Sequence, residues 1–306
     1  MNIFIKFNHK SKGIDRFLQS FSIYEGCKLF YVNNIQEANR QETDIAIYGG
    51  FLPQELLYAH PQFKYYTFCS PFGQADLSGQ NFLSPEIDIL YYVVDLIKNG
   101  KITGTITSSK ALAWSFDSFI YVPPVKVIDQ DDIHFTLERQ NYSMIGNNFR
   151  KHRNVVNQIA AVSRLTPKEK ICVAGDTFYK PFESLFNCEF YSKDLPDKDY
   201  YKAISQHKMN FQCSWSESFS YITLEYALMG VPTIVSPCID WVKSYILRVN
   251  NPDNPQEIYQ AAQSLLNNKE LYEDISEGLV SFAQDINKIN QEQLYKVINE
   301  NIVALL

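Results

Sequence analysis

The stretch "CSWSESFSYITLEYALMGVPTIVSP", residues 213–237, predicts the end of a strand, a loop, a helix and the next strand in quick succession. It also carries two glutamates, Glu217 and Glu225, with seven residues between them. Glu225 lies among apolar neighbours in "YITLEYALMG". Burying an unpartnered carboxylate costs several kcal/mol, so Glu225 requires either a solvated helix face or a polar partner.

The same rhythm of short apolar strands and helical patterns extends in both directions from this stretch. Strands alternating with helices predict parallel sheets built from βαβ units. The expected fold class is therefore α/β, with two tandem Rossmann-like, doubly wound domains and C-terminal helices. Strands are predicted at 2–7, 27–32, 43–50, 64–70, 102–109, 142–146, 170–176, 188–192, 209–214 and 231–236, and helices at 13–21, 86–101, about 150–165 and beyond 254.

A Pro-Pro pair followed by an acidic segment, "YVPPVKVIDQDDIHF", predicts the boundary between the two domains. Proline fixes φ and lacks a backbone donor, which suits a linker better than a central strand. The predicted division is 1–125 for an acceptor-side domain, 126–140 for the linker, 141–285 for a nucleotide-sugar-binding domain, and 286–306 for a helix that packs back on the first domain.

Composition narrows the class of protein. A chain of 306 residues that is 45% apolar can bury a large core, and its net charge of −6 gives no reason to expect nucleic acid as a partner. The six cysteines are widely spaced, and the histidines show no metal-ligand spacing. No apolar run reaches membrane-spanning length. We expect a cytoplasmic protein, with peripheral contact at the inner face of the membrane left open.

The loop "WSESFS" follows a predicted strand and leads into a helix N-terminus, a place where ligands and anions bind in α/β sheets. Ser218 and Ser220 are candidate N-caps. A ligand with vicinal hydroxyls would satisfy Glu225, because one carboxylate can accept two hydrogen bonds from a diol. A ribose is such a ligand.

The stretch resembles the E-x7-E signature of retaining glycosyltransferases of the two-domain GT-B fold, the family that includes glycogen synthase and sucrose synthase. That signature usually reads like E-G-F-G-x-x-x-x-E-A-x-A-x-G-x-P-V-V. The residues that match it in register are Glu217, Phe219, Glu225, Gly230 and Pro232.

The resemblance implies a role for each part of the motif. Glu225 would hold the ribose of a nucleotide-sugar, and Glu217 would lie beside the donor sugar near the transferred bond. Backbone N–H groups around the helix start would help to bind the sugar and phosphates. The implied donor-binding residues in this stretch are Ser218, Phe219, Ser220, Tyr221, Ile222 and Glu225.

An upstream stretch, "IGNNFRKHRNVVNQIAAVSRL" (145–165), resembles the strand, glycine, basic pair and helix that open the nucleotide-binding domain of that family. Lys151 and Arg153 would neutralise the diphosphate leaving group, with Arg150 as a competitor. Cations at a helix N-terminus are unfavourable by themselves, so a nearby anion accounts for them better. Gly146 and Gly175, at the ends of predicted strands, would allow close approach of the donor.

The chain also departs from the family pattern. Ser218 and Ser220 replace glycines, which narrows the expected sugar pocket, and "CIDWVKSY" replaces a Gly-rich loop that touches the sugar. The Gly-Gly loop of the first domain is represented only by "NHKSKG". Its candidates to face the cleft, by position alone, are Asn8, His9, Lys10 and Gly13.

These patterns lead us to expect a metal-independent, retaining glycosyltransferase without a cofactor. It would move a hexose-type sugar from a UDP- or GDP-sugar to a glycan or lipid-linked acceptor in surface polysaccharide or lipopolysaccharide synthesis. Two alternatives stay open: a catalytically silent relative that binds nucleotide or glycan as a partner subunit, and a GT-B nucleotide-sugar epimerase or sugar phosphorylase. The base, the sugar, the acceptor, the linkage and the oligomeric state are not specified by these patterns.

Overall fold

A computed structural model describes residues 4–7, 12–77, 86–145, 151–165, 169–174, 186–191, 195–302 and 304. The chain divides into two compact units. One runs up to Val127 and includes the chain from Asn287 onward, and the other is Ile128–Ile286. In the part of the chain that the structure describes, no helix is both long enough and apolar enough to cross a lipid bilayer.

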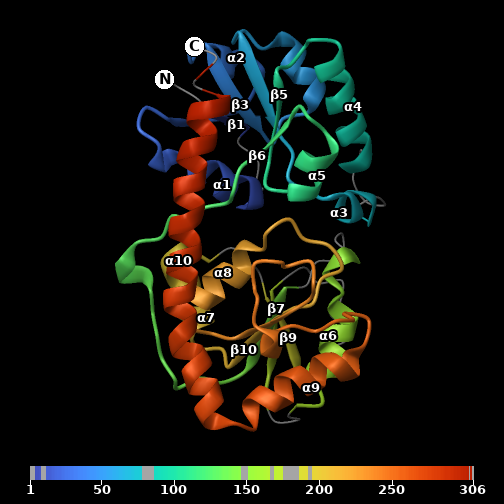
Figure 1. Cartoon of the computed structure of the whole chain (residues 1–306), viewed down its shortest axis with the longest axis vertical. Coiled ribbons are helices and arrows are strands. Elements are labelled where there is room, and N and C mark those ends of the chain that lie inside the picture. The colour runs from blue at the N-terminus through green and yellow to red at the C-terminus, as the bar shows by residue number, and fades with distance from the viewer. Residues whose placement is uncertain are drawn as a thin grey trace. The chain divides into compact units, whose positions relative to one another are not determined.

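The first unit contains a six-stranded parallel sheet with the order β2-β1-β3-β4-β5-β6 (Figure 1). Its strands are β1 (Phe4–Phe7), β2 (Leu29–Val32), β3 (Ile45–Gly49), β4 (Phe63–Thr67), β5 (Gly104–Thr107) and β6 (Phe119–Tyr121). Its helices are α1 (Lys12–Gln19), α2 (Ile35–Asn39), α3 (Phe72–Leu77), α4 (Glu86–Lys98) and α5 (Lys110–Ser115).

Strand β3 shows how helices come to cover both faces of this sheet. Its residues are all buried, and successive side chains point to opposite faces. Ala46 and Tyr48 belong to the apolar cluster that includes α2 and α4 residues. Gly49 faces the other way, where a Cβ would lie 2.6 Å from Leu18 Cδ1 of α1. The fully buried β3 has the nearly continuous apolar sequence that is typical of a parallel sheet covered on both faces.

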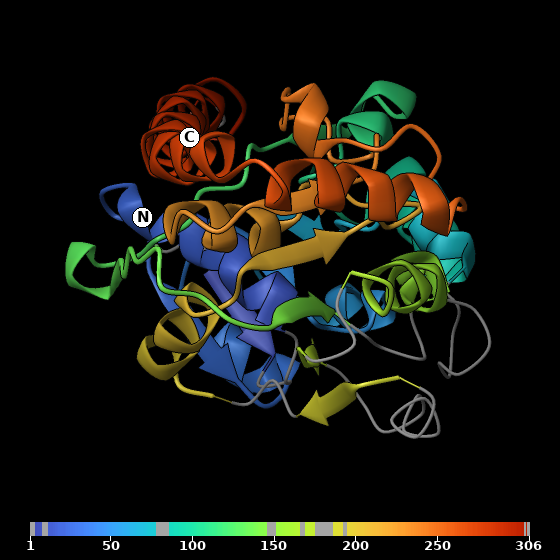
Figure 2. The ribbon, with the colours of Figure 1, turned by 90° about the horizontal axis from the view of Figure 1, so that it is seen from below.

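The second unit contains a five-stranded parallel sheet with the order β11-β10-β7-β8-β9. Helices α6 and α9 cover one face, and α7 and α8 cover the other (Figure 1). The strands are β7 (Tyr142–Ile145), β8 (Ile171–Ala174), β9 (Cys188–Tyr191), β10 (Met209–Gln212) and β11 (Thr233–Val235). The helices are α6 (Val155–Val162), α7 (Asp197–Ser205), α8 (Tyr221–Leu228) and α9 (Pro255–Leu266). Helix α10 (Lys269–Asn301), seen end-on in Figure 2, begins in this unit, and its residues from Asn287 onward belong to the first unit.

The predicted fold class, two doubly wound α/β domains with C-terminal helices, is confirmed by these two sheets. The pattern missed β6, which has three residues, and the short helices α2, α3 and α5, because elements of three to six residues carry little periodicity. The prediction of one helix over 150–165 was wrong at its start. Lys151–Arg153 form a separate 3-10 turn, and Asn154, with φ of 54°, lies between that turn and α6.

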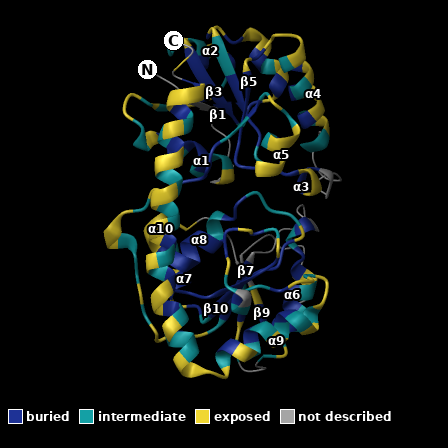
Figure 3. Ribbon diagram, viewed as in Figure 1, coloured by how far each residue is buried: buried dark blue, intermediate teal, exposed yellow. Residues whose placement is uncertain are grey.

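Helix α8 is buried on nearly all sides, as its dark blue ribbon in Figure 3 shows. Gly230 terminates it with φ of +68°, a left-handed conformation that favours glycine. Arg139, itself buried, donates to the carbonyl oxygens of Met229 (3.1 Å) and Gly230 (2.9 Å), which are left over at the helix end. A Cβ on Gly230 would lie 2.6 Å from the Phe135 ring, so this end of α8 has no room for a side chain.

A buried chain of polar groups joins α8 to the sheet. The hydroxyl of Tyr226 donates to Ser143 Oγ at 2.6 Å and lies 3.0 Å from Nδ1 of His207. Burial lowers the pKa of His207 from 6.5 to about 4, because the protonated ring would lose its hydration. The native protein therefore holds this histidine neutral.

We expect Gly230→Ala to lower the free energy of unfolding by about 2 to 4 kcal/mol, because a Cβ meets both a strained φ and the Phe135 ring. Gly278→Ala is the matched control, since that glycine lies inside α10 with open space around it. It should raise stability by about 0.5 to 1 kcal/mol. Urea unfolding measures both changes, and an equal effect of the two substitutions would contradict this account.

Stability should depend on the protonation of His207 between pH 6.5 and 4. Between these pH values the unfolded chain binds a proton on His207 that the folded chain does not. The free energy of unfolding therefore has its full value above pH 6.5 and falls as the pH approaches 4, by on the order of 3 kcal/mol. The free energy of unfolding is measured across this pH range for both proteins, and we expect its slope against pH to be smaller in His207→Phe than in wild type. His60→Gln, at an exposed position, should keep the wild-type slope.

Candidate functional site

The candidate site lies at the carboxyl ends of β7 and β10, where the strand order of the second sheet reverses. Such a switch point separates two neighbouring loops and is where doubly wound folds bind ligands. Here the residues after β7 and after β10 are tied together. The Trp215 N–H donates to the His152 carbonyl at 2.7 Å, and Asn154 Nδ2 donates to the Cys213 carbonyl at 3.0 Å.

Gln158 of α6 bridges the two loops with a single side-chain amide. Its Nε2 donates to the Arg153 carbonyl at 2.6 Å, and its Oε1 accepts from the Cys213 N–H at 3.0 Å. Gln158 is not among the site residues predicted from the sequence. A signal existed, because Gln158 is a polar residue inside the apolar run "VVNQIAAV", the same anomaly that drew attention to Glu225.

The switch point brings Arg153 and Glu217 together as an ion pair. Their side chains are only 15% and 6% exposed, so water screens the pair little. Nη1 of Arg153 also lies 3.4 Å from Oε1 of Gln212, at the end of β10. Two residues that lie 64 positions apart in the sequence therefore form one ion pair at the edge of the sheet.

Helix α8 starts at Tyr221, four residues after Glu217, with Ser220 as its N-cap. Ser220 Oγ accepts from the Thr223 N–H at 3.4 Å, as expected for one of the two candidate caps. Its backbone is left-handed, with φ of 68° and ψ of 78°, a conformation that costs a non-glycine residue on the order of 1 kcal/mol or more. A glycine, the residue usual at the corresponding place of the E-x7-E pattern, would adopt this conformation without that cost.

Glu225 is fully buried on α8, which answers the question that its position raised. A polar partner is Tyr200 of α7, whose hydroxyl donates to Oε2 of Glu225 at 3.1 Å. Tyr200 is not among the site residues predicted from the sequence. The "YY" pair at 200–201 has the appearance of packing residues, and no sequence pattern relates it to a glutamate 25 positions away.

Trp241 packs against the loop that precedes α8. Its indole N–H donates to the Phe219 carbonyl at 2.6 Å, and the two rings stack at 5.4 Å with an interplanar angle of 24°. Trp241 belongs to "CIDWVKSY", the segment that stands in place of the Gly-rich loop. A rigid, nearly buried ring supports the backbone here.

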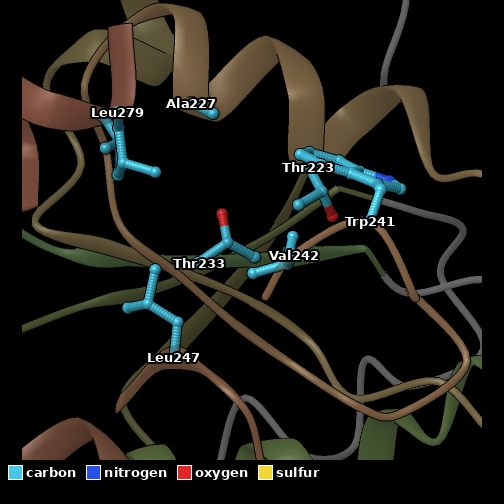
Figure 4. Close-up of a pocket in the computed structure, with 8 residues that line it drawn as sticks. Thr223, Ala227, Thr233, Trp241, Val242, Leu247 and Leu279 are labelled. Carbon is cyan, nitrogen blue, oxygen red and sulfur yellow. The ribbon is translucent and has the colours of Figure 1, made fainter. Parts of the chain in front are cut away.

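A small apolar cavity lies beneath α8, bounded by Thr223, Ala227, Val231, Thr233, Trp241, Val242, Leu247 and Leu279 (Figure 4). Its volume of about 10 Å³ is roughly enough for one water molecule. A nucleotide or a sugar does not fit there, so this cavity is a packing gap.

The other residues selected from the sequence fall into two groups. Ser218, Tyr221 and Ile222 are partly exposed around the start of α8, and Phe219 is 7% exposed. Gly13 is exposed in the first turn of α1, in the first unit, with open space around it. Outside the described residues lie Asn8, His9, Lys10, Gly146, Arg150 and Gly175, together with the side chain of Lys151.

Comparison with known proteins places the fold. No family model matches the chain, and no curated protein sequence matches it. Among solved structures, HepE of Anabaena in complex with UDP-glucose is similar over 97% of this chain and 100% of its own, with a TM-score of 0.69 and 12% identity. WaaG, a glycosyltransferase involved in lipopolysaccharide biosynthesis, is similar over 97% and 99%, with a TM-score of 0.68 and 12% identity.

A third solved structure, the sucrose-phosphate synthase of Thermosynechococcus elongatus, covers 95% of this chain and 78% of its own, with a TM-score of 0.65 and 12% identity. The structural neighbours are GT-B proteins of the retaining, glycogen-synthase-like group. The fold resemblance stated from the E-x7-E motif is thereby confirmed: this chain has the GT-B fold.

Breaking the Arg153–Glu217 pair should leave a nearly buried charge without its counterion. A double-mutant cycle with Arg153→Met and Glu217→Gln, measured by urea unfolding, is expected to give a coupling energy of about 1 to 3 kcal/mol. The matched control is Lys269–Glu273, an exposed pair on α10, with an expected coupling below about 0.5 kcal/mol. Equal coupling in the two cycles would refute the close pairing at the switch point.

Proposed function

We propose that this protein is a retaining glycosyltransferase that moves a hexose-type sugar from a UDP- or GDP-sugar to a glycan or lipid-linked acceptor. One observation carries the proposal. A cation and a carboxylate, Arg153 and Glu217, meet at the switch point of a GT-B sheet, next to a helix that buries a second carboxylate, Glu225. That set of groups suits a ligand with a diphosphate, a sugar and a diol.

The donor would bind to the second unit. Glu225 is fully buried in this structure, so donor binding would have to uncover it before its carboxylate accepts hydrogen bonds from the ribose hydroxyls. Backbone N–H groups at the start of α8 would face the anion, where the helix dipole is favourable. These backbone donors belong to Tyr221 and Ile222. Ser220 holds the helix start in a left-handed turn, which keeps those donors in place.

Negative charge that develops on the departing diphosphate would account for the cations Arg153 and Lys151 at the site. The bond between the anomeric carbon and the diphosphate oxygen breaks, and its electron pair goes to the diphosphate. A new bond forms to the acceptor oxygen, whose proton is released with the diphosphate. Arg153, with Lys151 beside it in the chain, would stabilise the negative charge without a metal ion.

Arg153 and Glu217 neutralise each other's charge as an ion pair. An incoming diphosphate would take over part of the Arg153 guanidinium, which presents several donors in a fixed fork. Glu217 would then be released beside the donor sugar, the position that the family resemblance implies for it.

The acceptor would bind to the first unit, and the pathway would be surface polysaccharide or lipopolysaccharide synthesis at the inner face of the membrane. The support is the likeness to HepE, crystallised with UDP-glucose, and to WaaG, described as acting in lipopolysaccharide biosynthesis.

A second candidate is a catalytically silent relative that binds a nucleotide diphosphate as a partner subunit. The observation that favours it is the segment "CIDWVKSY", where Trp241 fills and braces the place of a Gly-rich loop. The two candidates differ in turnover and not in nucleotide binding.

The decisive experiment is a thermal-shift panel of nucleoside diphosphates and their sugars, with and without chelator, on wild type and Glu225→Ala. We expect one base to raise the melting temperature in wild type whether or not chelator is present, and the shift to vanish in the variant. Glu273→Ala, at an exposed glutamate of α10, is the control and should keep the shift.

Slow hydrolysis of the donor, or transfer to an added acceptor, would separate the transferase from the silent relative. Nucleotide stabilisation with no turnover of any donor would favour the silent relative. The absence of any shift at millimolar nucleotide would contradict both.

A further inference from the structure

We propose that Tyr200 is a positioning residue that sets the orientation of the Glu225 carboxylate, and that it thereby makes donor binding selective for ribose over 2′-deoxyribose. This inference rests on the proposed function, in which Glu225 accepts hydrogen bonds from the nucleotide ribose. It adds a residue from a different helix, α7, to the binding of the donor.

The geometry begins with the buried carboxylate. Glu225 has no exposed surface, and its Oε2 accepts from the Tyr200 hydroxyl at 3.1 Å. An ionised carboxylate has about four lone-pair directions. The bond from Tyr200 uses one of them, and it restricts rotation of the carboxylate plane about its last torsion, which is otherwise soft.

Tyr200 is itself held in place. Its N–H donates to the Pro196 carbonyl at 2.9 Å in the first turn of α7, and its ring contacts the Tyr201 ring at 5.5 Å with an interplanar angle of 61°. Tyr201 is 2% exposed and packs in the core of the second unit. A half-buried ring on a helix that is fixed in this way delivers its hydroxyl to one position.

Orientation matters because a diol is recognised by two hydrogen bonds with fixed spacing. A carboxylate turned away from the plane of the diol can still accept one of the two hydrogen bonds. In that case the affinities for the ribonucleotide and the 2′-deoxynucleotide differ little. Polar groups fixed in advance discriminate strongly against a ligand that lacks the matching hydroxyl. Tyr200 would therefore influence selectivity as well as affinity.

The test uses isothermal titration of the nucleoside diphosphate that stabilises the wild-type protein, alongside its 2′-deoxy form. Tyr200→Phe removes only the hydroxyl. We expect the ribonucleotide to bind about tenfold more weakly and the 2′-deoxynucleotide to change less than threefold, so that the ratio of the two dissociation constants falls severalfold. Tyr201→Phe removes the neighbouring hydroxyl of α7 and should leave this ratio as in wild type.

A double-mutant cycle shows whether Tyr200 acts through the carboxylate. In a Glu225→Gln background, adding Tyr200→Phe should cause no further loss of ribonucleotide affinity. The melting temperature of Tyr200→Phe is measured first, so that its titrations are run at a temperature where the variant is folded.

The outcomes separate this inference from the function on which it rests. If Glu225→Gln weakens ribonucleotide binding while Tyr200→Phe keeps both the affinity and the ribose selectivity, the positioning role is wrong and the proposed function stands. A Tyr200→Phe variant that only melts earlier would give Tyr200 a structural role and would also overturn the inference. If wild type binds no nucleoside diphosphate, both fail.

Discussion

The burial of α8 is the constraint on which the second unit depends. A helix enclosed on nearly all sides has to satisfy every polar group that it carries, because an unsatisfied buried group costs about 1 to 3 kcal/mol. Ser220 caps its first turn, Tyr200 contacts Glu225, and Arg139 binds the last carbonyls. Each partner comes from a different segment, so the position of α8 is specified from several directions at once.

This constraint also accounts for two residues in uncommon backbone conformations. Ser220 at the start of α8 and Gly230 just after its end both have positive φ. Gly230 is the residue that this conformation favours, and the Phe135 ring closes the remaining space. Ser220 adopts the conformation at a cost and in return caps the helix. The candidate site is thus built beside the strained end of a helix that the packing holds firmly.

The connectivity of the sheet creates the site. Because β7 lies between β10 and β8, the segments that follow β7 and β10 leave the sheet in different directions. The polar side chains of Arg153, Gln158 and Glu217 come together at the carboxyl ends of these two strands. Glu225 was recognisable because carboxylates are rare in apolar stretches, and Glu217 because of its spacing from Glu225 in the E-x7-E pattern. Gln158 had the same signal but was not selected, and Tyr200 had none, because tyrosine is common in cores and its partner lies on another helix.

The sequence by itself determined the α/β class, the alternation that builds two doubly wound sheets, and the helix that carries Glu225. Apolar periodicity is a local property, so it can be read along the chain. It also required that Glu225 have a polar partner, without saying which one. Only the tertiary structure decided that Tyr200 is that partner, that Arg153 precedes α6 in a separate turn, and that Arg153 pairs with Glu217. These contacts join residues distant in sequence, and they depend on strand order and helix packing, which no local pattern encodes.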